Sequence, residues 1–254
     1  MELGNLTGKV AFVTGTSHGL GKGIALGLAK HGADVILASR KLGLNEALAE
    51  EIRGLGQKAL PVAMDVMKIA DISRAVEKSI EAFGRIDIFI NNAGTSPVFA
   101  NCVDVEEWAW DKIIDTNLKG LFFCAAKVAR EMMKHKYGRI INITSAAGNM
   151  GSPLVGPYGA SKAAVIQLTK TLALELAPYC ITVNAIGPSF FEVGVSEPVL
   201  KSREMTESII KRTPLGRVGL IEDLVGAVVF LSSDSASYIT GHTLFVDGGW
   251  CAGS

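Results

Sequence analysis

The sequence lacks any long hydrophobic run and any excess of one charge. No stretch reaches about 18 consecutive apolar residues, so we expect no membrane-spanning helix. The 25 basic and 25 acidic residues balance, which gives no electrostatic reason to expect nucleic acid as a partner. The start, "MELGNLTGKVAFVTG", lacks the basic n-region and long h-region of a signal peptide. We therefore expect a globular, cytoplasmic protein that binds neither membranes nor nucleic acid.

Residues that bind metals are also few. The 4 cysteines are Cys102, Cys124, Cys180 and Cys251, and no two have the spacing of a zinc site or a redox pair. We interpret them as reduced thiols, mostly buried, as is typical of a cytosolic protein. The 4 histidines are scattered, and none pairs with carboxylates at metal-ligand spacing. No metal site is predicted.

The sequence does contain short apolar runs, rich in Val and Ile, that alternate with segments of helical period. The runs predict strands at 9–15, 34–39, 58–65, 86–94, 138–145, 181–188 and 242–249. Helices are predicted at 19–31, 44–56, 69–84, roughly 105–135, 158–177 and 222–233. Most strands are apolar on both faces, as in a parallel sheet between two layers of helices. Residues 1–254 are predicted to form one α/β domain of three layers around a doubly wound, Rossmann-like sheet.

The first predicted strand ends in "TGTSHGLG", residues 14–21. Gly15, Gly19 and Gly21 lie where the chain must turn from the strand into a helix. Glycine permits that turn and lets backbone N–H groups approach a pyrophosphate at the helix N-terminus. A plain tight turn is the alternative for a glycine cluster taken alone. His18, within the loop, either meets the phosphates or lies in solvent.

The second predicted strand ends in "ASRK", residues 38–41, with Ser39 and Arg40 and no carboxylate at either position. In dinucleotide-binding folds an acidic residue here binds the adenosine ribose hydroxyls, whereas an arginine accommodates a 2′-phosphate. A guanidinium can bond a phosphate in a fork, and a carboxylate would repel it. The motif favours NADP(H) over NAD(H). A solvated arginine at a strand end is the alternative.

"GPYGASKAAV", residues 156–165, places Lys162 one helical turn after Tyr158. A phenol is a poor acid or base at neutral pH because its pKa is about 10. A nearby ammonium favours the phenolate and lowers that pKa. The pair is therefore a candidate acid/base device. By spacing alone, a surface pair on an amphipathic helix is the commoner explanation.

Several motifs, in this order along the whole chain, resemble those of the short-chain dehydrogenases/reductases. They are "TGTSHGLG", "MDV" (64–66), "NNAG" (91–94), Asn117 in "DTNLKG", Ser145 in "NITS", "YGASK" (158–162) and "NAIGP" (184–188). The C-terminal third is similar to the gluconate 5-dehydrogenase and 3-oxoacyl-carrier-protein reductase branches of that family. With this order of motifs, the acid/base interpretation of Tyr158 and Lys162 becomes the favoured one.

The resemblance implies roles for individual residues. Tyr158 would exchange a proton with the substrate oxygen, and Lys162 would lower its pKa and hold the nicotinamide ribose. Ser145 would hydrogen-bond the substrate oxygen, and Asn117 would hold a water that links Lys162 to solvent. The implied cofactor-binding residues are Gly15, Ser17, His18, Gly19, Leu20, Gly21, Ser39, Arg40, Asp65, Val66, Asn92, Ala93, Gly94, Tyr158, Lys162, Pro188 and Phe191.

Two of these residues have a structural alternative. Asp65 would bond the adenine amino group, with Val66 beside it, but an ordinary strand-end aspartate is the other interpretation. "NNAG" would pass its backbone along the adenine ribose. Asn92 would also brace the fourth strand against its neighbour, so its mutation would not report cofactor binding alone.

The chain departs from the family pattern after the sixth predicted strand. The family usually has Pro-Gly there and a threonine five residues after the proline, whereas this chain has Pro188-Ser189 and Val193. Val193 lacks the hydroxyl that would contact the nicotinamide carboxamide, so backbone groups near Phe191 are expected to serve instead. Residues 188–203 form the least regular part of the sequence and are a candidate lid.

The predicted activity is hydride transfer between NADP(H) and a secondary alcohol or ketone, with a polyol or a sugar acid such as gluconate favoured as substrate. A 3-oxoacyl thioester on a carrier protein is the alternative, and a cofactor-binding protein without turnover is a third. Lys201 and Arg203, in the predicted lid, are the candidates for binding a sugar-acid carboxylate. The family resemblance implies a homotetramer, in which the apolar C-terminal strand "HTLFVDGGW" would pack across a two-fold axis. Trp108 and Trp110 are interpreted as core or interface residues.

Overall fold

Strands and helices alternate through the computed structural model, which describes residues 4–253. The strands are β1 (Val10–Thr14), β2 (Asp34–Ser39), β3 (Ala59–Ala63), β4 (Ile88–Asn91), β5 (Gly138–Ile143), β6 (Ile181–Pro188) and β7 (Thr243–Val246). The helices are α1 (Gly19–Lys30), α2 (Leu42–Gly54), α3 (Ile69–Phe83), α4 (Glu107–Ile114), α5 (Leu121–His135), α6 (Gly156–Leu176), α7 (Glu197–Leu200), α8 (Arg203–Arg212) and α9 (Ile221–Ser232).

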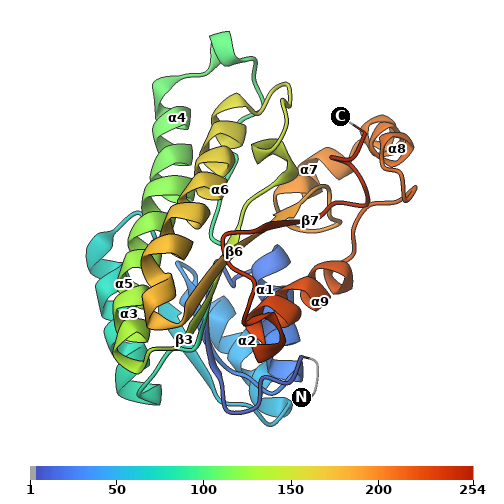
Figure 1. Ribbon diagram of the computed structural model, residues 1–254. Coiled ribbons are helices and arrows are strands. Elements are labelled where there is room, and N and C mark those ends of the chain that lie inside the picture. The colour runs from blue at the N-terminus through green and yellow to red at the C-terminus, as the bar shows by residue number, and fades with distance from the viewer. Residues whose placement is uncertain (1–3, 254) are drawn as a thin grey trace.

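Seven strands within the described residues form one parallel sheet in the order β3-β2-β1-β4-β5-β6-β7. The winding reverses between β1 and β4, which pair directly although β2 and β3 lie between them in the chain. Ligands of such folds bind outside the carboxyl ends of the strands at this switch point. Figure 1 shows the sheet between two groups of helices, which confirms the predicted single doubly wound α/β domain.

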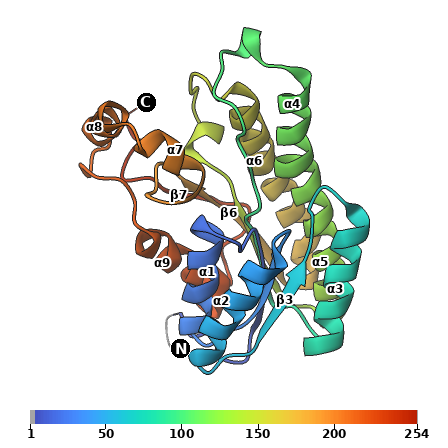
Figure 2. The same ribbon diagram turned by 180° about the vertical axis from the view of Figure 1, so that it is seen from behind.

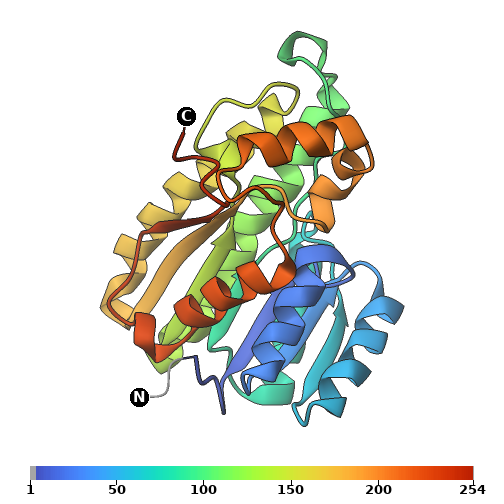
Figure 3. The ribbon, with the colours of Figure 1, turned by 90° about the vertical axis from the view of Figure 1, so that its right-hand side faces the viewer.

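Each face of the sheet packs on its own set of helices because side chains alternate between the faces of a strand. In β1, Ala11 and Val13 pack with α1, α2 and α9, while Val10 and Phe12 pack with α3, α5 and α6. Figure 3 shows the first group of helices in front of the sheet and the second group behind it. The core is therefore double, with the sheet buried between two apolar layers.

Several boundaries differ from the predicted ones. The strands predicted at 86–94 and 242–249 shorten to β4 and β7, because the residues after each run turn into loops. The single helix predicted over 105–135 is α4 and α5 joined by a π-helical segment, Asp115–Gly120. Helix α8 was not predicted. Figure 2 shows α7 and α8 together beyond the end of β6; α7 lies within residues 188–203, the predicted lid, where no helix was expected, and α8 begins at its end.

The thiols are less buried than predicted. Only Cys124, on the inner side of α5, is buried, whereas Cys102 and Cys180 are exposed and Cys251 is half-buried. Cys180 lies in a tight turn with φ of 57°, and Cys102 begins a short 3-10 turn in a surface loop. Burial raises the pKa of the Cys124 thiol to about 12, so that thiol is unreactive at neutral pH.

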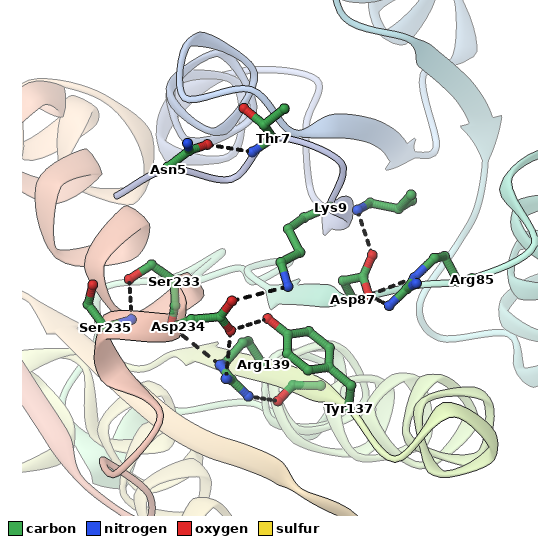
Figure 4. Close-up of polar contacts among 12 residues, drawn as sticks. Asn5, Thr7, Lys9, Arg85, Asp87, Tyr137, Arg139, Ser233, Asp234 and Ser235 are labelled. Atoms are coloured by element: carbon green, nitrogen blue, oxygen red, sulfur yellow. Dashed lines mark hydrogen bonds and ion pairs between the residues drawn. The ribbon is translucent and has the colours of Figure 1, made fainter. Parts of the chain in front are cut away.

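An ionic cluster joins elements at the amino end of the sheet. Asp234 accepts hydrogen bonds from the Tyr137 hydroxyl at 2.8 Å and from Arg139 at 3.0 Å, and the Lys9 ammonium lies 3.4 Å from it. Lys9 and Arg139 also lie over the Tyr137 ring, at 4.0 and 4.6 Å from its centroid. Figure 4 shows these side chains converging on Asp234. The cluster ties β1, β5 and the turn after α9 together at the opposite edge from the predicted ligand.

Candidate active site

A pocket of about 430 Å³ lies at the carboxyl edge of the sheet. All the residues predicted to bind a cofactor line it, and so does Ser145. The sequence pattern predicted these residues at strand ends and helix starts. Because the strands are parallel, their carboxyl ends lie at the same edge of the sheet. Asn117 does not line the pocket, because it is fully buried behind the wall.

Ser145, Tyr158 and Lys162 come together at one end of this pocket. Ser145 follows β5 directly, while Tyr158 and Lys162 occupy the first two turns of α6. The Ser145 and Tyr158 side chains share a hydrogen bond. The Thr144 hydroxyl donates to the Lys162 carbonyl at 2.7 Å, which ties α6 to the end of β5. The relative position of the three groups is therefore set by the packing of one helix on one strand.

The environment of Tyr158 differs from the prediction. Burial raises the pKa of Tyr158, and the hydrogen bond with Ser145 opposes that rise only in part. The Lys162 ammonium is 5.7 Å from the centre of the Tyr158 ring and donates to the Ile143 carbonyl at 2.8 Å. The expected lowering of the Tyr158 pKa by Lys162 is therefore not seen here, because the ammonium faces a backbone carbonyl and desolvation of the phenol is the larger effect.

Asn117 sits in the π-helical segment between α4 and α5, and such segments often mark functional sites. Its side-chain oxygen accepts the Thr95 N–H at 2.8 Å, and its amide donates to the Thr95 carbonyl at 2.9 Å and to Ser161 Oγ at 3.2 Å. The amide thus braces the loop after β4 against α6. Holding a water beside Lys162 stays a prediction for this residue.

The glycine loop after β1 packs closely against its surroundings. A Cβ at Gly21 would lie 2.1 Å from the Gly15 carbonyl oxygen, and one at Gly15 would lie 2.8 Å from the Asn92 amide. Gly15 also has φ of 73°, which favours glycine. The loop therefore packs closely only without side chains, and α1 begins at Gly19 beside it. His18 contacts Ser17 through a 2.9 Å hydrogen bond, so its contact with phosphate stays a prediction.

The corner after β2 separates the roles of Ser39 and Arg40. Arg40 is exposed at the pocket wall and makes no ion pair with any of residues 4–253. Ser39 is only 8 % exposed, and its hydroxyl donates to the Asn45 side-chain oxygen at 2.9 Å. The guanidinium is thus free for a phosphate. The serine proton is already used within the protein in this arrangement, so a contact between Ser39 and the cofactor stays a prediction.

Both structural alternatives for Asp65 and Asn92 have direct support. The Asp65 carboxylate accepts the Met67 N–H at 3.1 Å and so closes the turn after β3. The Asn92 amide donates to the Thr14 carbonyl at 2.8 Å, which braces the end of β4 against β1 as predicted. Both residues also line the pocket, so a contact with the adenosine stays a prediction beside these structural roles.

Comparison with known proteins shows the family. A family model described as "Enoyl-(Acyl carrier protein) reductase" matches residues 15–251. The chain is 38% identical over 253 residues to 2-dehydro-3-deoxy-D-gluconate 5-dehydrogenase of Dickeya dadantii, covering 98% of this chain and 97% of that protein. The chain belongs to the short-chain dehydrogenase/reductase family. It is therefore an oxidoreductase that acts on CH–OH groups or ketones.

Two further relatives of this short-chain dehydrogenase/reductase show the range of its branch. The 3-oxoacyl-(acyl-carrier-protein) reductase of Staphylococcus epidermidis is 40% identical, covering 95% of this chain and 98% of that protein. The solved gluconate 5-dehydrogenase of Burkholderia cenocepacia, in complex with NADP and tartrate, is 35% identical with a TM-score of 0.95. That match covers 98% of this chain and 97% of the solved one.

The loop after β6 shows how this short-chain dehydrogenase/reductase accommodates its unusual residues. The Ser189 hydroxyl donates to the Asp247 carbonyl at 3.1 Å, and Phe191 is buried and forms a bridge with Gly219. The loop adopts positive φ at Gly194 instead, where φ is 87°. A Cβ on Gly19 would come within 2.9 Å of Gly194 Cα, so this loop lies directly against the glycine loop.

Sequence reasoning missed several residues of the pocket wall. Lys112 lies on α4, and its ammonium contacts the Met67 thioether at 3.1 Å. The hydroxyls of Ser96 and Thr116 are buried in the wall and have no hydrogen-bond partner among the described residues. Thr116 directly precedes Asn117 in "DTNLKG", and that position was the sequence signal that could have found it. Buried hydroxyls without partners fit a wall that a polar ligand completes.

Lys162 provides a test of how deeply the site is buried. Desolvation lowers the pKa of its ammonium from 10.5 to about 8. Between those values the unfolded chain binds more protons than the folded one, so stability rises with pH. Lys162→Met does not titrate. The difference in unfolding free energy, wild type minus variant, should therefore rise by about 2 kcal/mol between pH 7 and pH 9.5.

Urea unfolding of both proteins at the two pH values measures this difference. The wild type carries the cost of the buried charge in full below pH 8 and loses it as the pH approaches 10.5. A difference between the two proteins that does not change with pH would show that Lys162 has an ordinary pKa in the folded state.

Proposed function

We propose that this chain transfers a hydride between NADP(H) and a secondary alcohol or ketone, with a small polyol or sugar acid as substrate. The observation that carries the proposal is the arrangement of one pocket, with the Ser145–Tyr158–Lys162 cluster at one end and the unpaired Arg40 at the other. The glycine loop lies between them. This order matches the parts of a phosphorylated dinucleotide followed by a reactive group.

The chemistry of the proposed reaction needs one proton for each hydride. When bound, NADPH supplies the hydride to the carbonyl carbon, and NADP accepts it in the reverse direction. Tyr158 donates its phenolic proton to the developing alkoxide, and Ser145 hydrogen-bonds the same oxygen. Burial raises the pKa of Tyr158, so the phenol is protonated at neutral pH and can act as the proton donor in ketone reduction.

Lys162 and Asn117 would assist this proton transfer, although neither exchanges the proton itself. The Lys162 ammonium lies beside Gly94. A Cβ added to this glycine would lie 3.4 Å from Lys162 Nζ and 3.5 Å from Asn117 Oδ1. Lys162 would hold the nicotinamide ribose and favour the phenolate during proton transfer. Asn117 would keep the "NNAG" loop in place for that contact through its hydrogen bonds to Thr95.

The basic side chains of the lid do not favour an acidic carrier protein over a small substrate. Lys201 lies 4.0 Å from Glu197, and Arg203 donates to Glu207 at 2.8 Å, so the basic side chains of the lid are matched by acidic neighbours. A basic patch that attracts an acidic carrier would need an excess of positive charge there. Neither residue lines the pocket, which also removes the support for their binding a sugar-acid carboxylate.

A panel of substrates tests the proposed activity. Gluconate, 5-ketogluconate, small polyols and a 3-oxoacyl thioester are incubated with NADPH, NADP and their unphosphorylated forms, and the nicotinamide absorbance is followed. We expect turnover of a sugar acid or polyol with the phosphorylated cofactor. Turnover of the thioester alone would favour the carrier-protein alternative. Binding of NADPH without turnover of any substrate would favour a cofactor-binding protein.

A homotetramer is also proposed. Strand β7 is the edge of the sheet, and its four residues are only half-buried although they are mostly apolar. On the other side, Leu174 of α6 is 80 % exposed, and Trp108 and Trp110 of α4 are also exposed. Two separate apolar faces suit the two kinds of contact in a tetramer with two-fold axes.

Light scattering with size separation checks the assembly. We expect a mass about four times the 26.8 kDa of one chain at micromolar concentration. A monomer at that concentration would contradict the proposal, and a dimer would show that only one of the two faces is an interface.

A further inference from the structure

Asn45 is a buried amide beneath the corner where the pocket would receive the 2′-phosphate. It lies in the first turn of α2 and is fully buried. Its side chain contacts the ends of β1, β2 and β3, through Thr16, Ser39 and the Val62 carbonyl. Neither the predicted cofactor set nor the pocket wall includes it. A fully buried amide with this many partners calls for a role in holding that corner.

The orientation of the amide follows from its partners. Asn45 Nδ2 donates to the Leu37 and Val62 carbonyls, each at 3.0 Å, which uses both of its hydrogens. The reversed orientation would place an oxygen against two carbonyl oxygens. Oδ1 must therefore face Thr16 and Ser39, whose hydroxyls donate to it at 2.8 and 2.9 Å.

This arrangement decides which side chains position 39 accepts. Oδ1 is an acceptor with no proton to give, so its neighbour must be a donor. Ser39 satisfies that condition. An aspartate at position 39, the residue that would bind ribose hydroxyls, would place a second acceptor against the Oδ1 of the fully buried Asn45. The hydrogen bonds of Asn45 thus disfavour at position 39 the acidic residue that would favour an unphosphorylated cofactor.

The same bonds hold Arg40 from both sides. Ser39 is tied to Asn45, and the Lys41 N–H donates back to Ser39 Oγ at 3.3 Å. Arg40 lies between these two residues, and its side chain forms no ion pair within the part of the chain that the structure describes. A forked contact between a guanidinium and a phosphate depends on geometry, so the backbone at this corner must be fixed for it to form.

We propose that Asn45 is a positioning residue that sets the preference for NADP(H) over NAD(H). It fixes the backbone on both sides of Arg40 and requires a hydrogen-bond donor at position 39. The inference rests on the proposed NADP(H) dependence of the enzyme. Through Thr16 the same amide also holds the start of the glycine loop, which both cofactors would contact equally.

Asn45→Leu, which keeps the size of the side chain, tests the role. The dissociation constants of NADPH and NADH are measured by titration calorimetry on the purified enzyme. We expect the NADPH constant to rise about tenfold, as for loss of one charge-assisted contact, and the NADH constant to rise less than about threefold. The ratio of the two constants should therefore approach one. An unchanged ratio would overturn the proposal.

Asn184→Leu is the matched control. Asn184 is a buried asparagine of β6 whose amide donates to the Ile239 carbonyl at 2.7 Å and whose oxygen accepts the His242 N–H at 3.1 Å. It should lower the melting temperature as Asn45→Leu does but leave the NADPH-to-NADH ratio at its wild-type value. A fall of the ratio in both variants would show general loss of stability rather than positioning.

If Asn45→Leu does not fold, single deletions of its two donors serve instead. Ser39→Ala removes the bond at the arginine corner and should lower the NADPH preference. Thr16→Val removes only the bond to the glycine loop and should weaken both cofactors alike. Equal effects of the two variants on the ratio would overturn the proposal.

The wild-type ratio separates this inference from the proposed function. A wild type that binds NADH as tightly as NADPH would show that the proposed cofactor preference is wrong and would overturn this inference with it. A wild type that prefers NADPH, with an Asn45→Leu variant that keeps the full preference, would overturn the inference alone.

Discussion

Tyr158→Phe should reduce ketone reduction by about 10²–10⁴-fold while NADPH binding stays near its wild-type strength. Phenylalanine keeps the ring and loses only the hydroxyl, which interacts with the Ser145 side chain. The backbone and side chain of Lys162 are held by Thr144 and Ile143 independently of that hydroxyl. The substitution therefore removes the proton donor and leaves the pocket wall in place.

Steady-state kinetics and NADPH fluorescence measure the two effects on the same preparation. Tyr238→Phe is the matched control, because Tyr238 is fully exposed and lies outside the pocket. It should keep the wild-type rate. Retention of more than about a tenth of the wild-type rate by Tyr158→Phe would exclude this tyrosine as the main acid/base group.

Arg40→Leu should lower kcat/KM with NADPH by roughly 10- to 100-fold and change the value with NADH little. The guanidinium is exposed at the pocket wall and is free of ion pairs with residues 4–253, so a 2′-phosphate would be its first charged partner. Charge-assisted hydrogen bonds contribute about 1.5–3 kcal/mol each, which corresponds to this range. The effect requires the phosphate, so the unphosphorylated cofactor should not show it.

Kinetics with both cofactors on the wild type and the variant test this prediction. Arg130→Leu, at an exposed arginine of α5 away from the pocket, should leave both values unchanged. A similar loss with both cofactors in Arg40→Leu would mean that Arg40 stacks on the adenine, a contact that does not distinguish them. Adding Ser39→Asp should not by itself reverse the preference, because Asn45 Oδ1 faces that position.

The sequence by itself determined the fold and the order of the site along the chain. Apolar runs of strand length between helical segments specify a parallel sheet, because each pattern depends only on residues a few positions apart. The glycines of "TGTSHGLG", Arg40 at a strand end and the one-turn spacing of Tyr158 and Lys162 are local features of the same kind. All of them lie in the one pocket that they predicted.

The tertiary structure alone decided what each side chain faces. Asn45 meets Thr16, 29 residues before it, and Asn117 meets Ser161, 44 residues after it. Lys162 faces the Ile143 carbonyl, and the Tyr158 pKa rises where its spacing from Lys162 had predicted a fall. Sequence spacing describes neighbours along one element, whereas hydrogen bonds and desolvation depend on which elements pack together. The Ser39 hydroxyl donates its proton to Asn45, which lies on the helix that follows the strand of Ser39. Only the folded chain brings these two side chains into contact.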